Sequence, residues 1–354
     1  MILHLIPVNG LSDEYINWLR LLGSHQDNVF CITSSRSAVI KYTPQLLGLR
    51  NAVILPEPGA KDKKKKIFFK TVSEMSKKAH IIIWHGMLST NKRFAAKFMK
   101  KSAVAEKSVM ICDGEEYQFL KSKYTDFLKL FDRFKRICFI NPIMQREFTN
   151  CEADIGLDTK KIFTMDLVPH RTFFKGICSE NGEFIFDHTN INMCIVPDLQ
   201  LSMEERQEYL ESLFDIKRYE EGHDPFIEQV CFEDTEVYCF IYKHKSNNKY
   251  KMLPYMDCVY FSDFRSWNMR FVLYALSLGK HVFINGDFYT DYFRSKGLTV
   301  FDASQFQSAD KSSFTKPLTE NINCPWLKEC MENDNIIAQW TDLINALKKD
   351  VTGV

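Results

Sequence analysis

Serine, arginine and asparagine side chains gather in one short stretch in the second half of the sequence. The stretch holds Ser262, Arg265, Asn268 and Arg270. It joins an apolar run that ends at Phe261 to an amphipathic run, and therefore lies between a strand candidate and a helix candidate. Because ligands of α/β sheets bind beyond the carboxyl ends of strands and at helix N-termini, the two guanidinium groups predict a diphosphate site, with Arg265 suited to bidentate contact. The alternative is that these arginines are solvated or cap a neighbouring helix.

A histidine follows one of the most apolar runs of the first half. The run His80-Ile-Ile-Ile-Trp84 is typical of a buried strand, so His85 lies at a carboxyl end and Gly86 allows a tight turn there. An imidazole in that position could take a proton from an acceptor hydroxyl group. A hydrogen-bonded structural histidine at a turn is the competing interpretation.

Acidic residues cluster at a third strand end, in Cys112-Asp-Gly-Glu-Glu-Tyr117. Asp113 is nearest the strand, and it is the carboxylate predicted to act as a general base. Glu115 and Glu116 equally suit the first turn of a helix, where the helix dipole favours negative charge.

Metal and cofactor chemistry is not expected. The nine histidines and eleven cysteines show no metal-ligand spacing, and there is no Asp-x-Asp. The cysteines form no C-x-x-C pair and many lie inside apolar runs, which favours free thiols in a reducing compartment such as the cytoplasm.

The composition indicates a soluble globular protein, because 45% of the residues are hydrophobic and 26% are charged. A net charge of +1 argues against nucleic acid as a partner. No apolar stretch approaches the roughly 20 residues that a membrane-spanning helix needs, and the short apolar N-terminus lacks the basic start of a signal peptide. The basic run from Lys61 to Phe69 predicts a solvated loop or, alternatively, a contact with anionic lipid.

Short apolar runs alternate with amphipathic ones along the whole chain, which predicts parallel sheets covered on both faces by helices. Strands are expected in the first half at 2–8, 29–33, 52–55, 81–84, 109–112, 137–140 and 162–165. Strands are expected in the second half at 191–196, 237–242, 258–261, 281–284 and 299–301. Helices are expected at 13–22, 70–78, 92–101, 116–134, 142–150, 203–214, 269–278, 289–296 and 333–348.

Proline and glycine interrupt this alternation between residues 168 and 187, where we place the connection between two domains. The predicted organisation is a first domain over 1–168, a second over 185–330, and a C-terminal helix in 331–354 that packs back on the first. The fold class is α/β, with two Rossmann-like doubly wound parallel-sheet domains facing a cleft, as in the GT-B type.

Several segments, in order along most of the chain, resemble the 4-acetamido-4,6-dideoxygalactose (Fuc4NAc) transferase family of bacterial surface-polysaccharide synthesis. The matching segments are the loop at 262–270, Leu278-Gly-Lys-His-Val-Phe-Ile-Asn285, Lys296-Gly-Leu-Thr-Val-Phe-Asp302, Ile2-Leu-His-Leu-Ile6, Ile83-Trp-His-Gly-Met-Leu88 and Val109-Met-Ile-Cys-Asp-Gly-Glu-Glu-Tyr117. The resemblance implies a TDP-sugar donor, held near Ser262, Arg265, Asn268 and Arg270. It also implies a saccharide acceptor on undecaprenyl diphosphate at the inner face of the membrane, with His85 or Asp113 as the base.

Two segments depart from that family. After the first strand of the second domain, Ile195-Val-Pro-Asp-Leu-Gln200 replaces a loop of small residues, so Pro197 removes a backbone donor and Asp198 adds negative charge. Ile111-Cys-Asp-Gly-Glu-Glu116 replaces an aromatic-Gly-Gly-Asp run. These departures leave open a catalytically silent sugar-transferase-like binding protein. The tripeptide Trp84-His85-Gly86, shared with CDP-glycerol polymerising enzymes, leaves open a CDP-polyol phosphotransferase.

Overall fold

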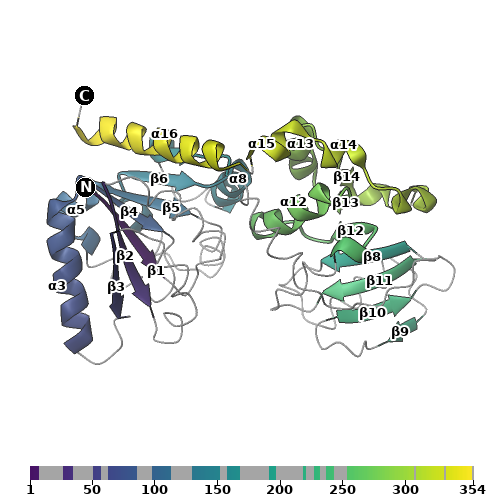
Figure 1. Ribbon diagram of the computed structural model, residues 1–354, viewed down its shortest axis with the longest axis horizontal. Helices are drawn as coiled ribbons and strands as arrows, with labels where there is room; N and C mark the ends of the chain where they lie inside the picture. The colour runs from purple at the N-terminus through teal and green to yellow at the C-terminus, as the bar shows by residue number, and fades with distance from the viewer. Residues whose placement is uncertain are drawn as a thin grey trace. The chain divides into compact units, whose positions relative to one another are not determined.

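The computed structural model describes residues 1–7, 27–34, 51–56, 63–85, 98–112, 130–151, 158–167, 191–196, 218–220, 227–231, 237–242, 253–306, 308–330 and 332–352. The chain divides into two compact units. Unit 1 contains Met1–His170 together with Met331–Val354, and unit 2 contains Arg171–Cys330. The chain therefore leaves unit 1 once and returns to it at its C-terminal end (Figure 1).

A seven-stranded parallel sheet forms the centre of unit 1, in the order β3-β2-β1-β4-β5-β6-β7. Its strands are β1 (Ile2–Pro7), β2 (Asn28–Ser34), β3 (Ala52–Pro56), β4 (Ile81–His85), β5 (Ser108–Cys112), β6 (Arg136–Phe139) and β7 (Ile162–Thr164). Every residue of β4 and β5 is buried. This burial explains why the central strands are continuous apolar runs instead of alternating ones.

Described helices beside this sheet are α3 (Lys63–Lys78), α5 (Ser102–Ala105), α8 (Pro142–Cys151) and α16 (Asn333–Thr352) (Figure 1). Helix α3 begins seven residues before the predicted start at 70, so the expected loop over the lysine run is helical from Lys63. Lysine is a good helix former, which accounts for the extension. The Phe69 ring is partly buried and stacks on Phe98 at 5.7 Å against the core.

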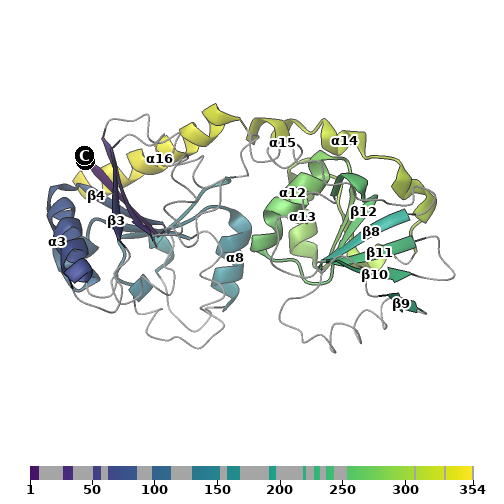
Figure 2. The same ribbon diagram turned by 60° about the horizontal axis from the view of Figure 1, so that its bottom comes forward.

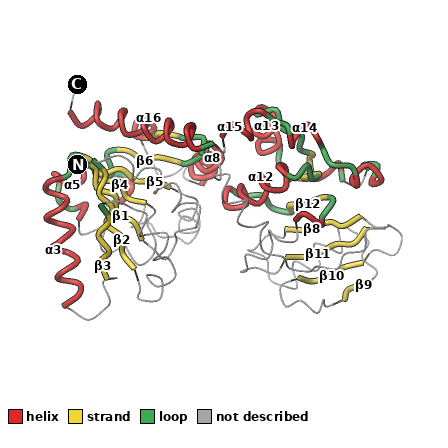
Figure 3. The backbone as a smooth tube through the Cα atoms, in the orientation of Figure 1, coloured by secondary structure: helices red, strands yellow, loops and turns green. Residues whose placement is uncertain are grey.

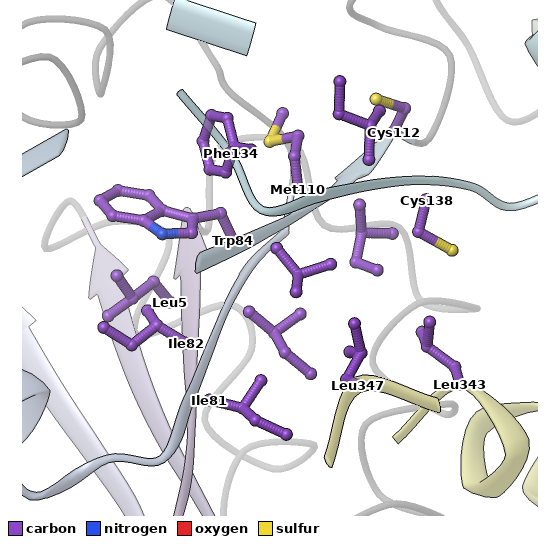
Figure 4. Close-up of a cluster of buried hydrophobic side chains, with 14 of the residues drawn as sticks. Leu5, Ile81, Ile82, Trp84, Met110, Cys112, Phe134, Cys138, Leu343 and Leu347 are labelled. Atoms are coloured by element: carbon purple, nitrogen blue, oxygen red, sulfur yellow. The ribbon is translucent and has the colours of Figure 1, made fainter. Parts of the chain in front are cut away.

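The last helix, α16, belongs to the core of unit 1. Its side chains Trp340, Leu343 and Leu347 are buried among the sheet residues. Figure 4 shows Leu343 and Leu347 beside residues of β4, β5 and β6. Near its C-terminal end, Arg136 of β6 donates two hydrogen bonds to Asp350, from Nε at 2.7 Å and from a terminal nitrogen at 2.9 Å.

The first half of α16 is held by the backbone that follows β7. The Asp166 backbone N–H donates to Gln339 Oε1 at 2.9 Å, and Gln339 Nε2 donates to the Asp166 carbonyl oxygen at 3.2 Å. These contacts fix the helix on unit 1 at both ends.

A second seven-stranded sheet forms the centre of unit 2, in the order β14-β13-β12-β8-β11-β10-β9. Figure 2 shows the part of this order from β12 to β9. Its strands are β8 (Ile191–Val196), β9 (Arg218–Glu220), β10 (Ile227–Cys231), β11 (Val237–Tyr242), β12 (Cys258–Phe261), β13 (His281–Ile284) and β14 (Phe301–Asp302). Strand β10 is antiparallel to β9 and β11, and the other pairs are parallel. The antiparallel edge was not predicted.

Helices and 3₁₀ turns precede and follow the strands from β12 to β14 in unit 2 (Figure 3). They are η3 (Leu253–Tyr255), η4 (Ser266–Asn268), α12 (Met269–Ser277), α13 (Asp287–Ser295), η5 (Ala303–Gln305), η6 (Lys311–Thr315), α14 (Thr319–Ile322) and α15 (Pro325–Cys330). Seven of the nine residues of α12 are buried, which explains its apolar sequence. A further 3₁₀ turn in unit 1, η2 (Thr159–Lys161), precedes β7.

A glycine ends α12 and turns the chain into β13. Gly279 has a φ of +72°, its N–H donates to the Leu276 carbonyl, and the Lys280 N–H donates to the Ala275 carbonyl. This pair of bonds is a Schellman motif, which needs a left-handed residue. A side chain at this position would also meet Ile322, because an added Cβ would lie 2.8 Å from Cδ1 of that residue.

In each sheet the strand order reverses at one point, the strand-order change, where successive strands are added first on one side and then on the other. In unit 1 this point lies between β1 and β4, and in unit 2 it lies between β8 and β12. Ligands of doubly wound sheets bind outside the carboxyl ends of the strands at such points. The predicted fold class of two Rossmann-like α/β units is confirmed.

Among the described residues, no helix is long and apolar enough to cross a membrane. Buried cysteines that form no disulfide bond lie at positions 31, 112, 138, 194, 258 and 324. Burial raises the pKa of Cys31 to about 12, so its thiol stays protonated and packs as a small apolar group.

Candidate functional site

The predicted diphosphate loop begins at the strand-order change of unit 2. Strand β12 ends at Phe261, and Ser262 follows beside the last residue of β8. Both the backbone N–H and the Oγ of Ser262 donate to the Val196 carbonyl oxygen, each at 3.3 Å. The loop therefore starts at the carboxyl ends of two adjacent parallel strands, where this kind of sheet binds ligands.

An ion pair occupies the middle of the loop. Arg265 Nε lies 2.9 Å from Asp263 Oδ2, and the two side chains are 25% and 22% exposed. The carboxylate orients the guanidinium group and also neutralises part of its charge. A diphosphate at this loop would therefore share Arg265 with Asp263, which was not among the predicted site residues.

The loop continues directly into a helix. Asn268 is the N-cap residue of α12, its side chain makes no capping hydrogen bond, and it is buried. Arg270 lies in the first turn, which carries no acidic residue. A cation at a helix N-terminus is unfavourable by itself, and an anion bound there would offset both the cation and the helix dipole.

His85 is the last residue of β4, in unit 1, at the strand-order change between β4 and β1. Its side chain is only 3% exposed. Trp340 of α16 lies against it, with ring centroids 6.0 Å apart. His85 thus lies at a strand end, as predicted, and Trp340 and its other neighbours shield it almost completely from solvent.

Two residues that were not among the predicted site residues join His85 in a line of hydrogen bonds. His85 Nε2 lies 2.9 Å from His4 Nδ1, and His4 Nε2 lies 3.2 Å from Asn28 Oδ1. The pairing of the strands explains the line, because His4 is opposite Phe30 on β2 and opposite Ile83 on β4. Side chains two residues apart share a face, so Asn28, His4 and His85 lie on one face of three adjacent strands.

Burial keeps both histidines of this line neutral. It lowers the pKa of His4 to about 4, although the hydrogen bond to Asn28 opposes the shift. It lowers the pKa of His85 well below 6.5, and repulsion from His4 adds to the effect. His85 is therefore unprotonated at neutral pH, as a base must be, but it binds a proton weakly.

The other predicted residues cannot be placed. Asp113 and the Pro197-Asp198 segment lie outside the described residues. Within the ranges that the structure describes, no group of three or more His, Cys, Asp or Glu side chains could hold a metal ion. The structure thus gathers Ser262, Arg265, Asn268 and Arg270 in unit 2, and places His85 in unit 1.

Two solved structures share the fold over nearly the whole chain. One is a glycosyltransferase from Rickettsia africae, with a TM-score of 0.54, 11% identity, and coverage of 99% of this chain and 98% of the other. The other is HepE from Anabaena, whose crystal structure contains UDP and glucose, with a TM-score of 0.58, 9% identity, and coverage of 98% and 100%. At such low identity the likeness shows the fold alone, which is the GT-B type.

No family model matches the sequence. No curated protein matches it either. The resemblance to Fuc4NAc transferases therefore remains a prediction from short segments.

Proposed function

We propose that the protein is a glycosyltransferase whose unit 2 binds a nucleotide-sugar. The observation that carries the proposal is the segment from Ser262 to Arg270, which places two arginines, a buried asparagine and a helix N-terminus at the strand-order change. The fold is shared with HepE, which binds UDP and glucose in its crystal structure. A nucleoside diphosphate carries the negative charge that Arg265, Arg270 and the N-terminus of α12 would attract.

The acceptor would bind unit 1, with His85 or Asp113 accepting the proton of its hydroxyl group. The hydroxyl oxygen forms a bond to the anomeric carbon of the sugar, and the bond from that carbon to the diphosphate oxygen breaks. The departing diphosphate takes the electron pair and is stabilised by Arg265, Arg270 and the start of α12. This chemistry requires no redox cofactor.

The finer assignment rests on the sequence resemblance. We propose a TDP-linked acetamido-deoxy sugar as the donor and a saccharide on undecaprenyl diphosphate as the acceptor, in the synthesis of a bacterial surface polysaccharide such as O-antigen. The enzyme would then work in the cytoplasm, peripherally on the inner face of the inner membrane.

Thermal-shift measurements with TDP-, UDP-, GDP- and CDP-linked donors test the donor class. Selective stabilisation by TDP-sugars supports the finer proposal, and selective stabilisation by CDP-polyols instead favours phosphotransfer. No response to any nucleotide contradicts the transferase proposal and favours a silent binding protein.

Arg265→Ala tests the position of the diphosphate. We expect the donor-induced shift to disappear, because the removed guanidinium group would contact the phosphates. Lys316→Ala is the matched control, since it removes one exposed positive charge of unit 2 near the opposite end of the sheet, where His281 at the start of β13 contacts the Lys316 carbonyl. An unchanged shift in the Arg265 variant would show that the diphosphate binds elsewhere.

A further inference from the structure

The end of unit 1 at which the strands begin carries an excess of positive charge. Helices α3 and α16 end at the same place, because α3 leads into β4 and Asp350 of α16 pairs with Arg136 at the start of β6. We call this region the basic end. It contains ten lysines and arginines but only five acids, in the stretches 27–28, 77–80, 106–108, 132–136, 158–161 and 348–350.

The excess belongs to this region, because the net charge of the whole chain is only +1. Part of it serves the fold. Lys107 Nζ donates to two carbonyl oxygens at the end of α3, at 2.6 and 2.7 Å. Arg136 pairs with Asp350, and Lys161 pairs with Asp132 at 3.2 Å. These cations hold the strand starts and helix ends together.

Helix dipoles favour cations in the last turns of α3 and α16, where Lys77, Lys78 and Lys349 lie. A helix end, however, has only about half a negative charge. The helices that end here therefore offset a small part of the excess. What remains is a set of exposed cations, namely Lys77, Lys78, Arg133, Lys135, Lys160 and Lys349.

The exposed cations are spread over the basic end. Lys135 comes two residues before Ile137 of β6. Lys160 likewise comes two residues before Ile162 of β7, and Ile137 pairs with Ile162. The two lysines thus start neighbouring strands at the same level, and Arg136 fixes them by donating to the Lys160 carbonyl oxygen. Cations that come from several elements and do not converge on one point fit an extended anionic surface better than a single small anion.

We propose that the basic end is the surface by which the protein binds a membrane containing anionic lipids. The choice of a membrane rests on the proposed function, in which the acceptor is linked to a lipid. Of the residues that the structure describes, the exposed large apolar ones are Val53, Tyr255 and Ile322, and none belongs to the basic end. Binding would therefore be electrostatic, with no side chain inserted into the bilayer.

This surface is not the lysine run that the sequence suggested for lipid contact. That run begins α3 at Lys63, whereas the basic end lies at the other end of this 16-residue helix. It also lies at the opposite end of β4 from His85. Substitutions at the basic end therefore leave the predicted site residues in place.

Cosedimentation of the full chain with lipid vesicles tests the proposal. We expect binding to vesicles that contain phosphatidylglycerol, little binding to pure phosphatidylcholine, and release in about 1 M salt, where charges are screened within about 3 Å. Equal binding to both kinds of vesicle would overturn the proposal. So would binding to heparin without binding to phosphatidylglycerol, which would indicate a polyanionic macromolecule as the partner.

Paired substitutions show whether the basic end is the surface that binds. A lysine close to an anionic bilayer raises the affinity about fivefold, so Lys135→Gln with Lys160→Gln should weaken binding at least about tenfold. Lys135→Arg with Lys160→Arg keeps the charges and should bind like the wild type. The matched control is Lys316→Gln with Lys328→Gln, which removes two exposed lysines of unit 2 and should change the affinity less than about twofold. Equal affinities in the two glutamine variants would contradict the assignment to the basic end.

Donor-induced thermal shifts separate this inference from the proposed function. Vesicle binding without a response to any nucleotide-sugar would leave the lipid surface standing while the transferase proposal fails. A donor response in a protein that does not bind phosphatidylglycerol vesicles would have the reverse meaning. The Lys135→Gln, Lys160→Gln variant should keep the wild-type donor response, and the same circular dichroism spectrum would show that it is folded.

Discussion

At the scale of single residues, the buried pair of histidines links stability to pH. His4 is neutral in the folded protein down to about pH 4, whereas an unfolded-chain histidine gains a proton near pH 6.5. Between these values the unfolded state binds more protons than the folded state, so the free energy of unfolding rises with pH. The free energy of unfolding is therefore not reduced by His4 above pH 6.5, and it decreases as the pH falls from 6.5 toward 4.

We expect this linkage to be measurable by chemical denaturation. The shift of His4 corresponds to about 3 kcal/mol between pH 6.5 and pH 4, and His85 contributes in the same direction. In His4→Asn the slope over this pH range should become smaller. The contrary result would be an equal slope in the variant and the wild type, which would mean that the slope comes from other groups.

At the scale of elements, the strand ends determine which polar residues meet, and this explains what the sequence could and could not predict. Strand β12 and the start of helix α12 were predicted correctly, because a central parallel strand is a continuous apolar run with a polar end, followed here by an amphipathic run. Strands β9 and β10 were missed because they mix charged and apolar residues at a sheet edge. The partnership of His85 with His4 and Asn28 depends on the register of three strands, which no local pattern shows.

A polar residue within an apolar strand was nevertheless a usable signal. His4 interrupts Ile2-Leu-His-Leu-Ile6, and a buried imidazole needs a partner. The roles of Arg265, Asn268, Arg270, Ser262 and His85 remain predictions. The sequence placed them at strand ends, but it did not show the ion pair of Arg265 with Asp263 or the cover of Trp340 on His85.

The end of α12 gives a stability prediction at this scale. Gly279→Ala should lower the free energy of unfolding of unit 2 by about 1–3 kcal/mol, because a Cβ disfavours the left-handed conformation and meets Ile322. Thermal unfolding measures the change. Gly279→Ala combined with Ile322→Ala relieves the contact but not the backbone strain, so a full recovery in the double variant would contradict the strain.

At the scale of the whole molecule, unit 1 is made from two separate parts of the chain. Residues Ile336, Trp340, Leu343, Ile344 and Leu347 of α16 are buried in its core. Removing them exposes apolar surface worth on the order of 10 kcal/mol, comparable with the total stability of a domain.

Truncation after Cys330 should therefore unfold unit 1, which loss of near-ultraviolet circular dichroism and of protease resistance would reveal. The matched control is Asp350→Ala, which removes the ion pair with Arg136 and should cost only about 1 kcal/mol, since both side chains are partly exposed. A truncated protein with a native unit 1 would show that α16 is dispensable to the core.

The return of the chain also orders events at the ribosome. The strands of unit 1 are made before unit 2, but the helix that covers His85 is made after every residue of unit 2. The ribosome can therefore complete unit 2 before it has synthesised α16, the helix that carries Trp340 and packs on the sheet of unit 1. The imidazole line of unit 1 therefore acquires its cover only after unit 2 has been made, and a ribosome that stalls before Trp340 leaves that apolar face open to chaperones.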